Sequence, residues 1–214
     1  YGGVVVCNRA VSAALGERLA EQFVEVLFAP GYDEVAIEAL VAKDGTRILV
    51  DQERRAFAGS SERDLKRVLG GLLVQERDVG GDPLDEMTIA CGEADADTWD
   101  DLLFAWTVVK HVSSNAIVIA RDRQTLGIGA GQMSRVDAVR LALEKAREHG
   151  HDLTGAVLAS DAFFPFADGP ELALDAGVGA IIQPGGSKRD AEVIAAARAR
   201  DATMILTGRR HFRH

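Results

Sequence analysis

Short runs of apolar, often β-branched residues alternate with stretches of helical periodicity along most of this chain, and this alternation constrains the fold more than any other feature. Within residues 1–51 the pattern predicts strands at residues 4–7, 23–28 and 47–50 and helices at residues 12–22 and 33–43. Leu15 and Leu19 share one side of the first helix. A β-α-β-α-β succession needs crossover connections, so the three strands are expected to pair in parallel.

The same alternation returns after residue 97. Thr98 and Asp101 have the spacing of a capping box, and Trp99 and Trp106 follow at helical spacing on one apolar face, which favours a core position over a stacking platform. Ser134 and Ser187 are expected to cap two later helices. The full set of expected elements is a helix from residue 98, a hairpin of strands 115–120 and 124–128, helices 134–149, 169–176 and 187–198, and strands 156–160, 179–183 and 203–206.

Residues 52–97 interrupt this pattern. Polar, glycine-bearing segments bracket residues 65–77, which are typical of a strand with an irregularity at Gly70–Gly71. We interpret residues 52–97 as an excursion with one or two strands that joins two sub-lobes, residues 1–51 and residues 98–214. The predicted fold class is α/β, with mixed sheets and helices on both faces.

The composition limits the kinds of molecule that this protein is expected to bind. Lys plus Arg is 24 and Asp plus Glu is 33, so the net charge is 24 − 33 = −9, which argues against binding to nucleic acid or anionic membranes. No window reaches the ~18 uncharged apolar residues of a membrane span. Cys7 and Cys91 lie among apolar residues, as the free thiols of a cytoplasmic protein do. The chain begins with Tyr1 in a strand and carries no signal peptide, so we expect a fragment of a longer protein.

Two loops carry candidate chemistry. Residues 127–135 place three alternate glycines between a strand and a capped helix; either a ligand approaches the backbone there or this is a tight strand-to-helix turn. The spacing is not that of a dinucleotide fingerprint, which disfavours an oxidoreductase. Residues 160–168 follow a strand and carry three phenylalanines, flanked by Asp161 and Asp168. They predict an apolar slot for a flat ring, with a hydrophobic plug or subunit contact as the alternative.

Two further segments follow strands. Residues 183–190 form a glycine turn before a helix, and residues 207–214 hold three arginines and two histidines, which suit a phosphate. A plain turn and a solvated basic tail are the respective alternatives. Lys110–His111 resembles a base with an electrophilic partner, but it lies at a helix C-terminus, which attracts cations anyway.

Taken together, these segments closely resemble the bifunctional purine biosynthesis family, which joins an IMP cyclohydrolase to an AICAR formyltransferase. The segments that carry the resemblance are Tyr1–Gly3, residues 29–32, 113–118, 127–135, 160–166 and 183–187, and the terminal Arg-His-Phe-Arg-His. The resemblance implies that this chain is the C-terminal part of the formyltransferase half, with lobes like cytidine deaminase but without zinc. It also implies that the IMP cyclohydrolase domain and the family's catalytic Lys-His pair lie upstream, so that this chain alone is inactive; Lys110–His111 falls at a different motif.

The resemblance further implies formyl transfer from 10-formyltetrahydrofolate to AICAR, giving FAICAR, which the complete protein cyclises to IMP. The implied catalytic residue in this chain is Asn115, as an oxyanion or nucleotide-positioning donor. The residues implied around AICAR are Gly2, Glu25, Asn115, Arg135 and Arg210. Those implied around the folate are Val136, Phe163, Asp168, Ser187 and Lys188.

Other implications concern ions and partners. A potassium ion is implied near Val109, Ser114, Asp161 and His211, and a cytoplasmic homodimer with shared active sites is implied as the assembly. Glu25 stands where some relatives have Asp, and Lys188 where others have a small residue, so their contacts are expected to be longer or through the backbone. The alternative function is a nucleotide-binding module without catalysis.

Overall fold

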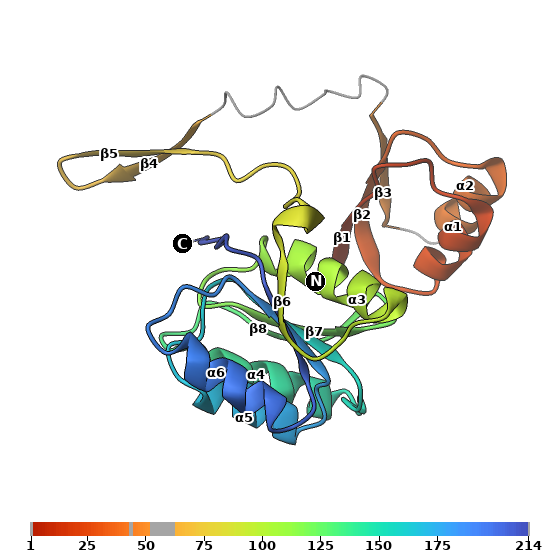
Figure 1. Cartoon of the computed structure of the whole chain (residues 1–214). Coiled ribbons are helices and arrows are strands. Elements are labelled where there is room, and N and C mark those ends of the chain that lie inside the picture. Colours follow the sequence, from red (N-terminus) through yellow and green to blue (C-terminus); the bar gives the residue numbers. More distant parts are fainter. Residues whose placement is uncertain (1, 43–44, 52–62, 214) are drawn as a thin grey trace. The chain divides into compact units, whose positions relative to one another are not determined.

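The computed structural model describes residues 2–42, 45–51 and 63–213. It divides into two units, Tyr1–Arg77 and Asp78–His214 (Figure 1). Expectations that concern Tyr1, Lys43, residues 52–62 or His214 lie outside the described residues. The division falls inside the expected excursion, since residues 63–77 belong to the first unit and residues 78–97 to the second. No helix in the described part is long and apolar enough to cross a membrane.

The first unit begins with the predicted β-α-β-α-β succession. Its elements are β1 (Gly3–Val6), α1 (Ala13–Ala20), β2 (Val24–Ala29), α2 (Glu34–Val41) and β3 (Arg47–Val50). The strands form a sheet in the order β1-β2-β3, and both pairs are parallel, as predicted. Leu19 is buried but Leu15 is 40% exposed, because the packing face of α1 is centred on Gly16, where an added Cβ would lie 2.5 Å from the Cβ of Ala36 in α2.

A hairpin completes the first unit. Strands β4 (Arg63–Val68) and β5 (Gly71–Glu76) pair antiparallel across Leu69 and Gly70. The interpretation of residues 65–77 as one strand with an irregularity is therefore wrong. Gly70 has φ = +85°, which a glycine adopts without strain, and this turn reverses the chain. Every residue of the two strands is exposed, including Leu65, Leu72 and Leu73.

The second unit is built on one mixed sheet with the order β6-β11-β10-β9-β7-β8. Its strands are β6 (Thr88–Cys91), β7 (Ile117–Arg121), β8 (Gln124–Gly129), β9 (Val157–Ser160), β10 (Ala180–Gln183) and β11 (Thr203–Leu206). Strands β9, β10 and β11 are parallel, whereas β6, β7 and β8 pair antiparallel with their neighbours. The predicted mixed sheet is confirmed. Strand β6 belongs to it rather than to an excursion, because its residues pair with β11.

Helices cover both faces of this sheet, as predicted (Figure 1). Helix α3 (Ala96–Val109) lies on one face, and α4 (Arg135–Glu148), α5 (Asp168–Asp175) and α6 (Asp190–Arg198) lie on the other. The strands alternate between the two layers: Ile117 and Ile119 pack toward α4, while Val118 and Ala120 pack toward α3. Trp106 is buried and Trp99 packs beside the same cluster, so both tryptophans are core residues. A short 3-10 helix, η2, spans Leu84–Glu86.

Two predicted helix starts are wrong by two or three residues. Helix α3 begins at Ala96, and the Asp95 side chain accepts from Thr98 N at 2.9 Å, so Thr98 lies inside the first turn instead of capping it. Helix α6 begins at Asp190, whose carboxylate accepts from Gly186 N and Ser187 N. At α3 the side chain of Asp95 takes the capping role expected of Thr98, whereas the Asp190 carboxylate accepts from backbone N–H groups that precede α6 and so fixes the turn before this helix.

Gly127 and Gly129 serve packing rather than ligand approach. A Cβ added to Gly129 would lie 1.9 Å from the carbonyl oxygen of Ala138, and one added to Gly127 would lie 2.1 Å from that of Ala142. Both carbonyls belong to α4, so these two glycines let α4 lie directly on β8. The alternative of a tight strand-to-helix turn describes Gly127 and Gly129 better than a ligand loop does.

This contact predicts the effect of Gly129→Ala. The new methyl group collides with helix backbone, which cannot rotate away, so the free energy of unfolding should fall by about 1–3 kcal/mol. Urea unfolding of the full chain measures it. Gly81→Ala is the matched control, because a Cβ there meets nothing within 4 Å, and its effect should stay within about 0.5 kcal/mol. Equal losses in the two variants would contradict the close approach of α4 to β8.

Candidate functional site

The candidate site lies at the edge of the second unit's sheet where the parallel strands end. Asp161 directly follows β9, and the C-terminal segment 207–213 follows β11. Strand β7 runs antiparallel to β9, with Ile117 opposite Ser160, so Asn115 and Ala116 come to the same edge from the start of β7. Arg135, the first residue of α4, completes the group. Open α/β sheets place their ligands at this edge.

Asp161 is fully buried and holds the group together. Its carboxylate accepts hydrogen bonds from the Ser114 hydroxyl, from Ala116 N at 3.0 Å and from the Arg135 guanidinium. Its backbone carbonyl accepts from His211 N at 2.9 Å. One residue thus ties together the loop before β7, the start of α4 and the C-terminal segment.

Arg135 is buried as well, with 8% of its side chain exposed, and it forms an ion pair with Asp161. The same guanidinium donates to the Ser160 hydroxyl at 3.2 Å and, through its other terminal nitrogen, to Asn115 Oδ1 at 2.9 Å. A buried charge needs such a partner, since an isolated one costs several kcal/mol. The charge of Arg135 is therefore balanced within the protein.

The contacts of Asn115 fix the orientation of its amide. Arginine only donates, so the side-chain atom that faces Arg135 is the oxygen. The amide nitrogen then donates to Gln132 O at 2.8 Å. A primary amide has two N–H groups, and within the described residues the second has no protein acceptor. The peptide bond between Ser114 and Asn115 is cis.

The loop after β9 differs from the expected slot of three phenylalanines. Phe164 is fully buried in the core, Phe163 is half-buried, and Phe166 is 50% exposed. The side-chain oxygen of Gln183, at the end of β10, accepts from Phe164 N at 3.0 Å and so fixes the loop. Only Phe163 and Phe166 are available to a ligand.

The next loop meets this one through an aromatic contact. The Arg189 guanidinium lies 4.8 Å from the ring centroid of Phe166. The Ser187 hydroxyl accepts from Arg189 N at 3.1 Å, and Lys188 is exposed. The structure therefore brings residues 160–168 and 183–190 together, as their positions after neighbouring strands predict.

Two other predicted folate residues lie at helix starts. Asp168 is the exposed first residue of α5, and its carboxylate accepts from Gly169 N at 2.8 Å. Val136 is half-buried in the first turn of α4. Asp161 and Asp168 do not form the expected pair of polar anchors, because Asp161 is buried and faces Arg135.

The C-terminal segment separates its arginines. Arg209 pairs with Glu86 at 2.8 Å and with Asp82 at 3.7 Å. Arg210 is exposed, with its guanidinium 5.3 Å from the Phe212 ring centroid, and the described part of the chain offers it no acidic partner. His211 is buried, and its ring faces Asp78 and Asp82.

Sequence reasoning missed Asp78 and Asp82, because both lie in the segment interpreted as an excursion. Burial opposes the charge of Asp82, but hydrogen bonds from Trp106 and His211 and the nearby Arg209 outweigh it and lower the pKa of this carboxyl below its ordinary value. Lys110, the capping residue at the end of α3, pairs with Asp78 at 3.1 Å, and His111 is exposed. The structural explanation of Lys110–His111 is thus the better one.

Gly2 and Glu25 come together within the first unit. Gly2 N donates to Glu25 Oε1 at 2.8 Å, and a Cβ on Gly2 would lie 2.7 Å from Glu25 Cγ. The parallel pairing of β1 with β2 produces this contact. The glycine is needed because a Cβ there would also lie 2.9 Å from the backbone carbonyl oxygen of Phe23, which cannot move aside as a side chain can.

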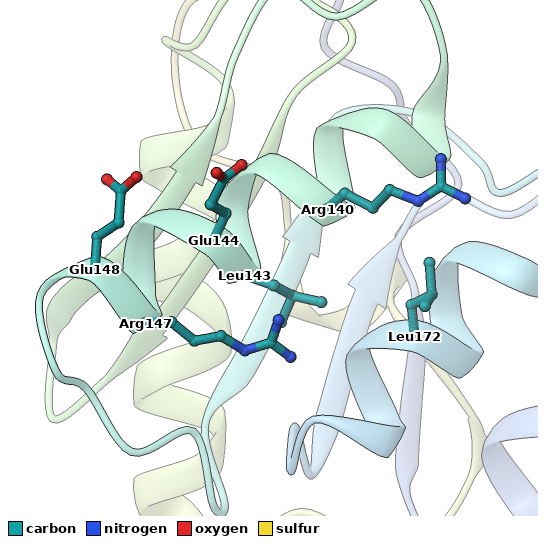
Figure 2. Close-up of a pocket in the computed structure, with 6 residues that line it drawn as sticks. All are labelled: Arg140, Leu143, Glu144, Arg147, Glu148 and Leu172. Carbon is teal, nitrogen blue, oxygen red and sulfur yellow. The ribbon is translucent and has the colours of Figure 1, made fainter.

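Two grooves are lined by other residues. One, of about 550 Å³, runs along the outer side of α4 and α5 and carries charges of both signs (Figure 2). Its lining residues are Arg140, Leu143, Glu144, Arg147, Glu148 and Leu172. The other, of about 670 Å³, lies at residues 6–10 and Leu15 of the first unit. Neither contains a predicted site residue. Across the described residues no cluster of three or more His, Cys, Asp or Glu side chains is arranged to hold a metal ion.

Comparison with known proteins identifies relatives. The family described as AICARFT/IMPCHase bienzyme matches residues 1–145. Proteins named bifunctional purine biosynthesis protein PurH are 49% identical over 222 residues in Magnetococcus marinus and 52% identical over 215 residues in Chloroflexus aurantiacus. Both alignments cover 100% of this chain and 42% of the relative, so the chain spans about two fifths of the length of these relatives.

Among solved structures, the chain is similar to a diaminohydroxyphosphoribosylaminopyrimidine deaminase/5-amino-6-(5-phosphoribosylamino)uracil reductase from Thermotoga maritima. The alignment covers 50% of this chain and 34% of that one, at 19% identity and a TM-score of 0.33. A TM-score this low does not establish a shared fold, so the similarity to cytidine deaminase lobes stays a prediction.

The buried ion pair predicts the consequence of Asp161→Ala. The variant leaves the Arg135 charge buried without its partner, so the free energy of unfolding should fall by about 3–5 kcal/mol. Urea unfolding measures this loss. Asp85→Ala, at an exposed aspartate of the same unit, is the control and should change stability by less than about 0.5 kcal/mol. An Asp161→Ala protein as stable as the control would show that Arg135 does not depend on this carboxylate.

Proposed function

Because the chain belongs to the AICARFT/IMPCHase bienzyme family, we propose that it forms the C-terminal part of the formyltransferase half of such an enzyme. The proposed reaction transfers the formyl group of 10-formyltetrahydrofolate to the 5-amino group of AICAR and gives FAICAR, in purine biosynthesis. The complete protein would also cyclise FAICAR to IMP. The observation that carries this proposal in the structure is the fixed amide of Asn115.

The chemistry needs two groups near the reacting amine. The amine of AICAR is a weak nucleophile, because its lone pair is delocalised into the imidazole carboxamide. As it attacks, the C–N bond to the formyl carbon forms, the formyl oxygen gains negative charge, and the amine loses a proton to a base. Collapse of this intermediate breaks the bond between the formyl carbon and N10 of the folate, and N10 takes up a proton as tetrahydrofolate leaves. A general base and a hydrogen-bond donor for the oxyanion are therefore required. We assign the base to the part of the complete protein outside this chain, following the family resemblance.

Asn115 suits the role of the oxyanion donor. Its amide is oriented by Arg135 on one side and by Gln132 O on the other, so the remaining N–H keeps a fixed direction. A donor that is already oriented stabilises developing charge without reorganisation during the reaction. Arg135 acts through Asn115 in this proposal, and its pairing with Asp161 keeps the net charge near the amine small.

The nucleotide phosphate is assigned to Arg210. Among the arginines of residues 209–213, Arg209 already pairs with two carboxylates and the Arg213 guanidinium donates to His111 O at 3.0 Å. Arg210 is exposed and can offer a planar fork to phosphate oxygens. Gly2 and Glu25 are proposed as further contacts of AICAR, because the family resemblance implies them and because a hydrogen bond joins them.

The folate is assigned to Val136, Phe163, Asp168, Ser187 and Lys188. The half-buried ring of Phe163 gives an apolar surface for the flat pterin, and Phe166 with Arg189 extends the same loop pair. Lys188 is exposed, and we expect its contact with the folate to be made through its backbone.

The proposed potassium ion has few ligands here. The Asp161 carboxylate faces Arg135 and two other donors, and the His211 ring faces two carboxylates. The carbonyl of Val109 accepts from Val112 N. These side chains do not suit a cation, so the expectation of a potassium ion depends on backbone carbonyl oxygens alone. The proposed formyl transfer does not use this ion.

A cytoplasmic homodimer is proposed as the assembly. The β4–β5 hairpin supports it, because an isolated pair of strands is marginal in water and here exposes Leu65, Leu72 and Leu73 on its own. A second copy of the protein would cover them. Free Cys7 and Cys91 are consistent with a reducing compartment.

Asn115→Ala in the full-length protein tests the catalytic proposal. The variant loses the oxyanion donor, so kcat for formyl transfer should fall by about 10²-fold, with a smaller change in the KM for AICAR. Steady-state kinetics with both substrates measure this. Met133→Ala, a fully exposed residue of the neighbouring loop, should leave kcat unchanged. Weaker AICAR binding with an unchanged kcat would make Asn115 a ground-state ligand and favour the nucleotide-binding alternative.

Arg210→Ala tests the phosphate assignment. A hydrogen bond between charged groups contributes about 1.5–3 kcal/mol, so the affinity for AICAR should fall about 10- to 150-fold, and Arg210→Lys should recover part of it. Calorimetric titration of the full-length protein with each substrate measures the affinities. Arg209→Ala removes the ion pairs with Glu86 and Asp82 but no proposed contact with the phosphate, so it should cost less than about fivefold. Loss of folate binding with unaltered AICAR affinity would reverse the two assignments.

A further inference from the structure

A cluster of side chains under the C-terminal segment has no role in the proposed reaction. It consists of Asp78, Asp82, Trp106, Lys110 and His211, and we call it the tail clamp. Asp78 and Asp82 come from the stretch between Arg77 and η2, Trp106 and Lys110 come from α3, and His211 comes from the C-terminal segment. All five lie in the second unit.

His211 anchors the C-terminal segment in this clamp. Its neighbours Arg210 and Phe212 are exposed, whereas His211 is 4% exposed. Its Nδ1 lies 2.5 Å from Asp78 Oδ2 and its Nε2 lies 2.8 Å from Asp82 Oδ2. The ring also packs against Trp106, with the centroids 4.8 Å apart. A side chain held at both nitrogens and on one face keeps a single position.

Asp82 connects the largest number of these groups. One of its oxygens accepts from Trp106 Nε1 at 2.6 Å as well as facing His211, and the other lies 3.7 Å from the Arg209 guanidinium. The carboxylate is 10% exposed. Asp82 therefore ties α3 to both Arg209 and His211, the residues that flank Arg210 on either side.

We propose that Asp82 is a positioning residue that, together with His211, holds the C-terminal segment so that Arg210 is presented to an anionic phosphate ester while Arg209 is kept away from it. The proposal rests on the proposed function, in which Arg210 binds the phosphate of AICAR. It assigns a binding role to a segment, residues 78–82, that contributes no predicted site residue.

The ion pairs around the C-terminal segment support these different roles of Arg209 and Arg210. Asp78 pairs with Lys110 at 3.1 Å, Glu86 pairs with Arg209 at 2.8 Å, and Asp82 faces Arg209 and His211. Each of these three carboxylates thus has a cationic or hydrogen-bonding partner, which reduces its repulsion of a nearby phosphate. Among the described arginines of the C-terminal segment, Arg209 pairs with carboxylates and Arg213 donates to His111 O, whereas Arg210 is exposed and has neither kind of partner.

The test compares Asp82→Ala with Asp85→Ala in the full-length protein. Asp85 is an exposed aspartate three positions away and serves as the matched control. Asp82→Ala should raise the KM for AICAR about tenfold, because Arg210 loses its fixed position, while kcat and the KM for 10-formyltetrahydrofolate change less than about threefold. Asp82→Glu should recover part of the loss. An unaltered KM for AICAR, or an equal rise for both substrates, would overturn the proposal.

Hydrogen–deuterium exchange of peptides that cover residues 207–213 gives a second measurement that needs no substrate. Exchange in this segment should be faster in Asp82→Ala than in the wild type and unchanged in Asp85→Ala. His211→Gln should reproduce the faster exchange, and it replaces Asp82→Ala where that variant does not fold. If the wild-type protein does not bind AICAR, the proposed function is wrong. The exchange rates of residues 207–213 still test the tail clamp in that case, and equal rates in the wild type and all variants would refute it.

Discussion

The buried ion pair between Asp161 and Arg135 is the interaction on which the site depends. Two charges that leave water are stable together only when their remaining hydrogen-bonding groups are also satisfied. Here Ser114, Ala116 N and Ser160 supply those partners, and the second terminal nitrogen of Arg135 is satisfied by Asn115. The requirement to satisfy a buried pair therefore fixes, together with the acceptor Gln132 O, the direction of the amide to which catalysis is assigned.

Sheet topology explains why these residues meet. Asn115 and Asp161 are far apart in sequence, and a purely parallel sheet would place the start of β7 at the opposite edge from the end of β9. Strand β7 instead runs antiparallel beside β9, so its first residues reach the edge where the parallel strands end. Helix α4 must then begin at that edge too, and Gly127 and Gly129 let it lie close enough for Arg135 to reach Asp161.

Much of this architecture follows from the sequence, because hydrophobic periodicity reports which face of each element is buried. This periodicity predicted the parallel strands of the first unit, the hairpin of β7 and β8, and the mixed sheet with helices on both faces. Helix starts were misplaced where an acidic side chain competed with the predicted cap, as Asp95 did with Thr98. Asp78 and Asp82 were missed for a different reason. Their contacts with His211 span more than 100 residues, and no local pattern signals such a contact.

In the proposed binding mode, the tail clamp lets an acidic protein accept a phosphate ester. A net charge of −9 repels an anion at long range, but at physiological ionic strength this repulsion is screened over ~8 Å, so charges beyond the nearest neighbours contribute little. What decides local affinity is whether the carboxylates close to the binding arginine are already engaged. Asp82 and Glu86 are engaged by Arg209, and Asp82 by Trp106 and His211 as well. A basic residue that neutralises its acidic neighbours therefore supports an anion site without touching the anion, and in the proposed binding mode Arg209 has this smaller role beside Arg210.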